Sequence, residues 1–252
     1  MRISLVRTIA LFILIVHETA NADCGDLRPY ADLTGCDFSR MNLAGKDLRG
    51  ARLTGAKLEN ANLRGVDLSG ADLRKANAKW AHFEESRLVE ADLRDADLFH
   101  AIFDRADLSR AKLRGAYLFG ANLIGARARG ADFAQAYLKD ILMEGIDLSG
   151  GSLQDCYAFR SVLMDAKLVG TDLSGADLTG AAAERADFSK ARLHRTRLSG
   201  ATLREAEFAS ADLLDADFAH ADLWNARFDR VTNLPASLTE ALSEAFTGRA
   251  KP

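Results

Sequence analysis

Proline is scarce in this chain, and its positions matter more than its number. Only Pro29, Pro235 and Pro252 occur in 252 residues, so the whole stretch 30–234 contains none. Proline lacks a backbone N–H donor, and a long proline-free stretch therefore suits an array of strands in which every N–H is needed. The three prolines mark the ends of whatever structure lies between them.

Signatures of catalysis and of metal binding are missing as well. The sequence contains no nucleophile elbow, no phosphate-binding loop and no arrangement typical of a catalytic triad. His82, His100, His194 and His220 are scattered, and none stands at metal-ligand spacing from a cysteine or a second histidine. We therefore expect neither an enzyme nor a metal ion or other cofactor.

Charge of one sign does not dominate. The chain carries 33 basic and 36 acidic residues, a net charge of −3. A nucleic-acid-binding protein would show a clear excess of basic residues, so we expect no nucleic-acid partner.

The one long apolar run lies at the N-terminus. Two arginines precede the apolar stretch 8–16, and a small-x-small site at 20–22 precedes Asp23. This order is typical of a secretory signal peptide, and the apolar stretch is too short for a membrane-spanning anchor. A lipoprotein signal is disfavoured because Asp23 stands where a small neutral residue is expected. We predict that residues 1–22 are removed on export to the periplasm or the medium, without stable membrane insertion of the mature chain.

A five-residue repeat fills most of the remaining sequence. From Leu33 to Phe228, every fifth residue is Leu or Phe except Met143 and four alanines, which gives 40 in-phase repeats without an insertion. The residue two places earlier is alanine in 28 of the 40, and 16 of the 19 glycines lie two places later. Such regularity at a fixed period outweighs local propensity in predicting the fold.

A period of five fits neither a straight strand nor a straight helix. In a strand, an odd repeat would turn the leucines to the opposite face at each step. In a helix, five residues advance about 500°, so the leucines would move round every face. A chain that turns a corner once per repeat removes this conflict, because the alanine and leucine positions can then both point inward. Glycine two residues after the leucine provides backbone freedom for the corner, and four corners close a square coil of about 20 residues.

The pattern resembles the pentapeptide repeat family, whose units read A-[DN]-L-x-x. Residues 71–73, 106–108 and 211–213 each read Ala-Asp-Leu. The resemblance covers residues 31–230 and implies an all-β fold, a right-handed quadrilateral β-helix of about ten coils. At about 4.8 Å per coil, the rod would be roughly 48 Å long.

The segments outside the repeat are expected to close its two ends. Residues 23–30 would form an N-terminal cap, and a disulfide between Cys24 and Cys36 can pin it over the first coil in an oxidising compartment. Cys156 stands at an inward, alanine-like position about six coils from Cys36, too far for a bond, so we expect a buried free thiol.

The C-terminal segment 231–252 carries a helical pattern. After Pro235, apolar residues recur at helical spacing: Leu238, Ala241, Leu242, Ala245 and Phe246. We expect a short helix that either caps the last coil or forms a dimer contact.

Outward positions show one departure from the polar pattern. Residues 20 apart would stack on one another, and Tyr117, Tyr137 and Tyr157 form such a ladder. Between residues 97 and 164, the outward positions of two adjoining sides turn aromatic and aliphatic. We name the following eleven residues the lateral patch: Phe99, Ile102, Tyr117, Phe119, Ile124, Tyr137, Leu142, Tyr157, Phe159, Val162 and Met164.

An exposed apolar patch usually marks contact with another molecule, and aromatic residues and Met are enriched in interface cores. The lateral patch therefore predicts a protein interface, with either a partner protein or a second copy in a homodimer. Two alternatives remain open: the ladder stabilises stacked strands without any partner, or a terminal segment folds back over the patch.

The resemblance implies a further alternative, since some pentapeptide repeat proteins mimic duplex DNA and bind bacterial topoisomerases. Without residues 1–22, the chain has 31 basic and 35 acidic residues, which is far from the dense negative charge of DNA. Arg74, Arg94 and Arg114 recur beside Asp72 and Asp92, which predicts interleaved ion pairs. An exported, non-catalytic β-helical scaffold is therefore the favoured prediction, and topoisomerase binding gains weight only if residues 1–22 are not a signal peptide.

Overall fold

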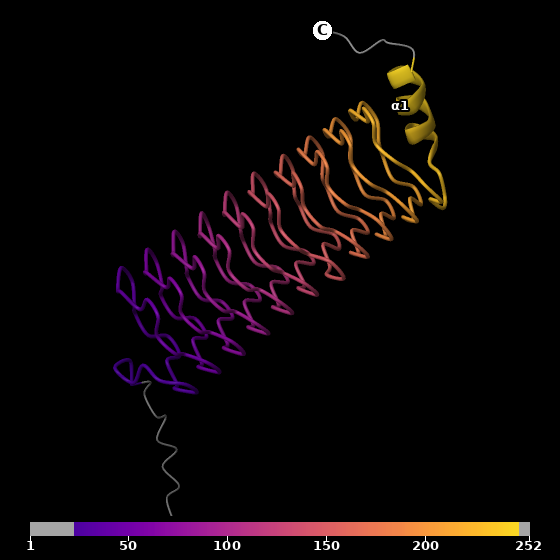
Figure 1. Cartoon of the computed structure of the whole chain (residues 1–252). Coiled ribbons are helices and arrows are strands. Elements are labelled where there is room, and N and C mark those ends of the chain that lie inside the picture. Colours follow the sequence, from indigo (N-terminus) through magenta and orange to yellow (C-terminus); the bar gives the residue numbers. More distant parts are fainter. Residues whose placement is uncertain (1–22, 247–252) are drawn as a thin grey trace, which may run out of the picture.

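The computed structural model describes residues 23–246, which wind into a rod of stacked square coils (Figure 1). Coils occupy residues 31–230 without interruption, and helix α1 (Ala236–Phe246) follows at the C-terminal end. The β-structure consists of single-residue parallel bridges between positions 20 apart, from Asp32↔Arg52 to Asp212↔Thr232. Each coil therefore contains 20 residues. The predicted signal peptide, residues 1–22, lies outside the described residues.

Each coil has four sides, which we name by the inward residue at the leucine position of the first coil. Side A begins with Leu33, side B with Phe38, side C with Leu43 and side D with Leu48, and each side continues at every twentieth residue. The leucine position and the residue two before it are buried along nearly the whole rod. The residues directly before and after the leucine position lie on the outer surface, and residues 20 apart form a column.

Two residues at the inward alanine position are exposed to solvent, and both lie near the open N-terminal end. Met41 and Lys46 occupy the alanine position of sides C and D in the first coil, yet both are exposed. The cap segment 23–30 therefore leaves these two sides of the first coil uncovered.

A left-handed residue makes the corner in all 40 repeats. The corners are β-turns closed by backbone bonds such as that from the Cys36 N–H to the Leu33 carbonyl, and the third residue of each turn has φ between 52° and 71°. Sixteen of these residues are glycine, but 24 are not, for example Arg40 and Trp80. The predicted dependence of the corner on glycine is therefore incomplete. Left-handed backbone costs a non-glycine residue roughly 1–2 kcal/mol, which stacking of the coils must offset.

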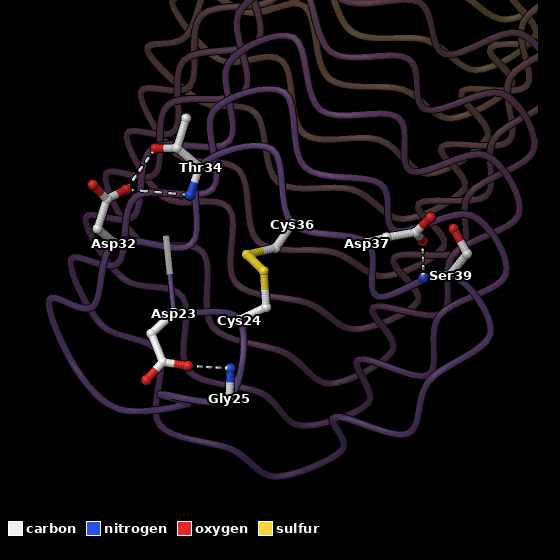
Figure 2. The surroundings of a disulfide bond; sticks show 8 residues. All are labelled: Asp23, Cys24, Gly25, Asp32, Thr34, Cys36, Asp37 and Ser39. Carbon is white, nitrogen blue, oxygen red and sulfur yellow. Dashed lines mark hydrogen bonds between the residues drawn. A yellow bond between two sulfur atoms is a disulfide. The ribbon is translucent and has the colours of Figure 1, made fainter. Parts of the chain in front are cut away.

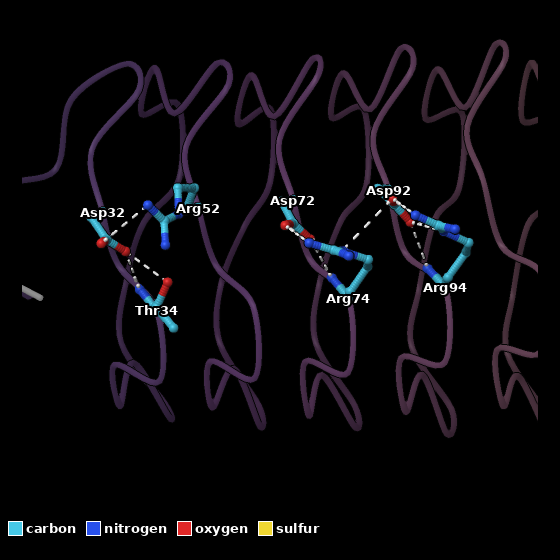
Figure 3. Close-up of polar contacts among 7 residues, drawn as sticks. All are labelled: Asp32, Thr34, Arg52, Asp72, Arg74, Asp92 and Arg94. Atoms are coloured by element: carbon cyan, nitrogen blue, oxygen red, sulfur yellow. Dashed lines mark hydrogen bonds and ion pairs between the residues drawn. The ribbon is translucent and has the colours of Figure 1, made fainter.

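Where a repeat unit carries Asp or Asn before the leucine, this residue has a local role at the corner. Its side-chain oxygen accepts a hydrogen bond from the backbone N–H two residues later, as between Asp32 and Thr34 (3.2 Å) (Figure 3). On side A, the Arg74 guanidinium donates to Asp72 at 2.6 Å and lies 3.8 Å from Asp92 of the next coil. The predicted interleaved ion pairs are thus present on this side.

The N-terminal end is held by a disulfide between Cys24 and Cys36, whose Cα atoms lie 5.6 Å apart (Figure 2). The Tyr30 N–H donates to the carbonyl of Arg49 at 2.8 Å, so the cap joins the hydrogen-bond register of the first coil. Cys156 is a buried free thiol, and burial together with the charge of Asp177 raises its pKa.

Helix α1 covers part of the last coil. The Ser237 hydroxyl donates to the carbonyl of Ala216 at 3.0 Å and accepts from the N–H of Phe218 at 3.2 Å. Leu238 is fully buried and Leu242 packs beside it against the core. These contacts are those of a cap.

Candidate protein-interaction surface

The tyrosines of the lateral patch stack in one column on side B. Ring centroids lie 5.0 Å apart for Tyr117 and Tyr137, and 5.2 Å apart for Tyr137 and Tyr157. The parallel bridges place these residues directly above one another. The ring planes of Tyr117 and Tyr137 are stacked at 21°, whereas those of Tyr137 and Tyr157 are tilted by 40°. Each such pair also stabilises the coils by about 0.5–1.5 kcal/mol beyond its area burial.

A second column on side B combines phenylalanines with one lysine. Phe99 and Phe119 stack at 5.6 Å, and the Lys139 ammonium lies between the rings of Phe119 and Phe159, at 5.8 and 5.9 Å from their centroids. Cation–π contact of this kind contributes about 0.5–1 kcal/mol at an exposed site. The two columns touch, since Phe119 lies 6.4 Å from Tyr137. Side B thus presents one continuous aromatic strip.

Side C supplies the aliphatic half of the lateral patch. Bridges connect Ile102, Asn122, Leu142 and Val162 in one column, while Ile124 and Met164 occupy the other column. Ile124 and Leu142 each have 37% of their surface exposed, and Tyr117 on side B has 39%. The structure therefore brings all eleven predicted residues onto two adjoining sides, and several large apolar side chains remain open to solvent.

Two aromatic residues of this surface are not anticipated from the sequence. Trp80 is 43% exposed and packs edge-on against Phe99 at 5.1 Å. His100 lies 4.3 Å from Phe99 and 5.7 Å from Phe119, again edge-on. Both stand at the corner position, outside the two outer columns that contain the lateral patch. Their spacing of 20 residues could have indicated that they lie in one column. The aromatic strip therefore extends one coil further towards the N-terminus than predicted.

Carboxylates line the aliphatic half of the patch. The column after the leucine position on side C begins with Glu84, and from the next coil acidic and aliphatic residues alternate: Asp104, Ile124, Glu144, Met164 and Glu184. Within residues 23–246, Asp104, Glu144 and Glu184 form no ion pair closer than 4.0 Å. Asp104 Oδ1 and Glu184 Oε2 are shielded from solvent without a hydrogen-bond partner.

The acidic column begins at a shallow cleft on side C. The cleft has a volume of about 510 Å³ and is lined by Arg64, Gly65, Glu84, Glu85, Asp104 and Arg105. Arg64 donates to Glu84 at 2.6 Å and Arg105 to Glu85 at 2.7 Å, which leaves Asp104 as the carboxylate without an ion pair. Burial, together with the charge of Glu84, raises the pKa of the Asp104 carboxyl. A cation brought to this position would stabilise the ionised form.

Metal clusters and membrane-spanning helices are absent from the part of the chain that the structure describes. Among residues 23–246, no group of three or more His, Cys, Asp or Glu side chains is arranged to hold a metal ion. Within the same residues, no helix has the length and apolar character needed to cross a membrane.

The fold defines a β-helical solenoid protein with a mixed aromatic and aliphatic surface on two sides. A family model described as pentapeptide repeats matches the chain in 8 copies between residues 31 and 232, so the chain belongs to the pentapeptide repeat family. Members of this family fold into right-handed quadrilateral β-helices, which confirms the predicted fold class.

Solved structures of similar proteins belong to the same family. HetL, a pentapeptide repeat protein involved in heterocyst differentiation regulation in the cyanobacterium Nostoc sp., is 29% identical, with 81% of this chain and 88% of that chain covered and a TM-score of 0.33. Trypsin-treated QnrB1, a plasmid-mediated fluoroquinolone resistance protein, is 21% identical, with 89% and 99% covered and a TM-score of 0.49. A pentapeptide repeat protein of the Arabidopsis thaliana thylakoid lumen is 26% identical, with 52% and 77% covered and a TM-score of 0.18. Comparison with curated proteins gives no match.

Proposed function

We propose that this protein is an exported, non-catalytic scaffold that binds another protein through the lateral patch. Pentapeptide repeat proteins are generally structural or interaction scaffolds, which supports the class. The observation that carries the proposal is the cluster of outward apolar residues on sides B and C, where other parts of the rod carry ion pairs.

Stacking between coils does not account for the whole patch. The tyrosine column gains stability from its own ring contacts, so its existence alone does not require a partner. Stacking does not cover every apolar side chain, however, because Tyr117 on side B and Ile124 and Leu142 on side C stay exposed. Exposed apolar surface of this kind is stabilised by burial against a second molecule.

The described parts of the two termini do not cover the lateral patch. The cap segment 23–30 is tied to the first coil by the Cys24–Cys36 bond, and α1 packs on the last coil. The patch lies between them, in the coils that contain residues 97–164. A partner from outside the described chain is therefore the occupant that we propose.

Export is supported by two separate features. The sequence of residues 1–22 is typical of a signal peptide. The paired Cys24 and Cys36 suit an oxidising compartment outside the cytoplasm. Mass spectrometry of the protein recovered from periplasm or medium tests this part: we expect a chain that begins at Asp23, and an intact chain retained in the cytoplasm would contradict export.

The interaction is tested with Tyr137→Asp in the chain that begins at Asp23. Aspartate is common at this outer position, so the variant should fold, with an unchanged circular dichroism spectrum. Ser152→Asp makes the same change on side A and serves as the matched control. Light scattering after size exclusion, followed by binding measurements, should show that Tyr137→Asp alone loses assembly or partner binding. Equal behaviour of both variants and the unaltered chain would contradict the proposal.

The surface does not favour the topoisomerase-binding alternative. A mimic of duplex DNA needs dense negative charge, whereas basic and acidic side chains pair along this rod, as Arg185 does with Asp165 at 2.7 Å and Arg127 with Asp107 at 3.3 Å. Such pairing neutralises the surface on most sides.

A further inference from the structure

The two halves of the lateral patch differ in charge. On side B, the carboxylates next to the aromatic strip are all paired: Asp97 with Lys79, Asp140 with Arg160, and Asp177 with Arg197. On side C, Asp104, Glu144 and Glu184 have no cation within ion-pair distance among the described residues. The aromatic half is therefore close to neutral, and the aliphatic half is acidic.

The unpaired carboxylates are interleaved with the aliphatic residues of side C. Asp104, Glu144 and Glu184 lie in alternate coils of one column, and Ile124 and Met164 occupy the coils between them. At about 4.8 Å per coil, successive carboxylates are roughly 10 Å apart. A molecule that covers the aliphatic residues of side C therefore also covers Glu144 between them and meets Asp104 and Glu184 at the two ends.

This charge pattern discriminates among occupants of the patch. Nucleic acids and anionic lipid surfaces would be repelled, because like charges brought together at an interface are unfavourable. A second copy related by a two-fold axis would bring the same surface into the contact twice, and so double the number of unpaired carboxylates without adding a column of basic residues. A partner with basic residues among apolar ones satisfies both features of side C.

From this pattern, and resting on the proposed function, we infer that the partner of the lateral patch is a different protein that presents a basic, apolar-rich segment to side C. Its aliphatic or aromatic side chains cover Ile124, Leu142 and Met164, and its Lys or Arg side chains lie over Asp104, Glu144 and Glu184. The cleft beside Asp104 provides room at the N-terminal end of this contact.

The inference is tested with a display library of random 16-residue peptides, selected on the immobilised chain that begins at Asp23. Peptides are selected in parallel on three variants. The first, Asp104→Asn/Glu144→Gln/Glu184→Gln, removes the three charges and keeps the shapes of the side chains. The second is Tyr137→Asp. The third, Asp107→Asn/Asp147→Asn/Asp187→Asn, removes three charges from side D and is the matched control.

We expect the selected peptides to be enriched in Lys and Arg among apolar residues. The amide variant of side C should weaken their binding about tenfold, since each exposed ion pair accounts for roughly a two- to fivefold change in affinity. The side D control should change it less than about twofold. Raised ionic strength should reduce the difference between the unaltered chain and the side C variant.

The outcomes separate the two proposals. In one outcome, Tyr137→Asp abolishes peptide binding, but the selected peptides are acidic or neutral and bind the side C amide variant equally well. The inference of a basic partner is then wrong, and the proposed interface stands. If no peptide binds better to the unaltered chain than to Tyr137→Asp, both are wrong. A stable dimer in light scattering that Tyr137→Asp dissociates would also overturn the inference, because it would make the partner a second copy.

Discussion

The imidazole ring of His100 covers the corner of the next coil at Gly120, where an added Cβ would lie 2.5 Å from the ring carbon Cε1. The ring cannot move freely, since it packs edge-on against Phe99 and Phe119. Glycine is thus favoured at position 120 for two reasons, its φ of 61° and the ring above it. The aromatic strip and the backbone corner depend on each other at this point.

Gly120→Ala is expected to destabilise the rod by about 2–4 kcal/mol, the sum of a left-handed alanine and an overpacked contact. Gly55→Ala is the matched control, because Gly55 has a φ of 64° and no atom lies within 4 Å of the place that an added Cβ would take. The control should lose only about 1 kcal/mol. Urea denaturation measures both, and equal losses would show that the contact with His100 does not matter.

Loss of the disulfide should loosen the N-terminal coil. The bond joins residues 12 positions apart, and a loop of that size contributes about 3 kcal/mol through the unfolded state. The double variant Cys24→Ser/Cys36→Ala places an alanine at the inward position, where most repeats have alanine. Hydrogen exchange should show faster amide exchange in residues 31–50 and little change beyond the neighbouring coils, as each coil contacts only its neighbours.

Cys156→Ala is the control for that experiment. Cys156 occupies the same inward position without a disulfide, and its replacement should cost less than about 1 kcal/mol. Uniform loss of protection along the whole rod in the double variant would contradict a local role for the bond.

The ion pair of Asp72 and Arg74 should make stability depend on acid pH. The Arg74 hydrogen bond lowers the pKa of Asp72 to about 2. Because the folded-state pKa lies below the unfolded value, this contribution is present above about pH 4 and is lost as the pH falls towards 2. Asp72→Asn should therefore be less stable than the unaltered chain by about 0.5–1 kcal/mol at pH 7, and by nearly nothing at pH 2.

Denaturant midpoints between pH 7 and pH 2 measure this difference. Asparagine can still accept the backbone N–H bond at the corner, as Asn62 does from Arg64 at 3.2 Å, so only the charge is removed. A gap between the two proteins that stays constant down to pH 2 would exclude the ion pair as its cause.

Leu238 is expected to hold α1 on the last coil. Its side chain is fully buried, so Leu238→Ala should cost about 2–3 kcal/mol and increase amide exchange in residues 211–230. Leu234 is 55% exposed, and Leu234→Ala should change stability by less than about 0.5 kcal/mol. Similar effects of the two substitutions would mean that α1 is not anchored through Leu238.

The path of the chain was predictable because one register recurs 40 times. Leu33 and Phe228 obey the same rule as every repeat between them, and the phase never changes, so the inward and outward positions follow from counting. The eleven residues of the lateral patch could be gathered for the same reason, since stacking converts a spacing of 20 into direct contact.

Side-chain direction at the corners and ion pairing between coils could not be predicted from the repeat register. Trp80 and His100 stand at corner positions, where the direction of the side chain depends on a left-handed backbone. Neither residue type by itself indicates that backbone conformation, so the direction could not be predicted. The lack of an ion pair at Asp104 could not be predicted from the sequence either. Arg105 follows it directly in sequence, yet its guanidinium pairs with Glu85 of the preceding coil instead. Pairing between coils is decided by side-chain reach and competition among neighbours.

Helix α1 has a consequence for how molecules of this protein can join. Throughout the rod, the backbone N–H of the leucine position and the carbonyl of the alanine position form hydrogen bonds with the following coil. On one side of the last coil, the Ser237 hydroxyl replaces that coil: it accepts from the N–H of Phe218 and donates to the carbonyl of Ala216. An open edge of parallel strands is a template onto which another chain can add, and repeated addition produces fibrils. Because α1 occupies part of that edge, it obstructs the first coil of a second molecule from continuing the stack. The helix thus hinders end-to-end growth at the C-terminal end of the rod, and contacts with other molecules are favoured at the sides.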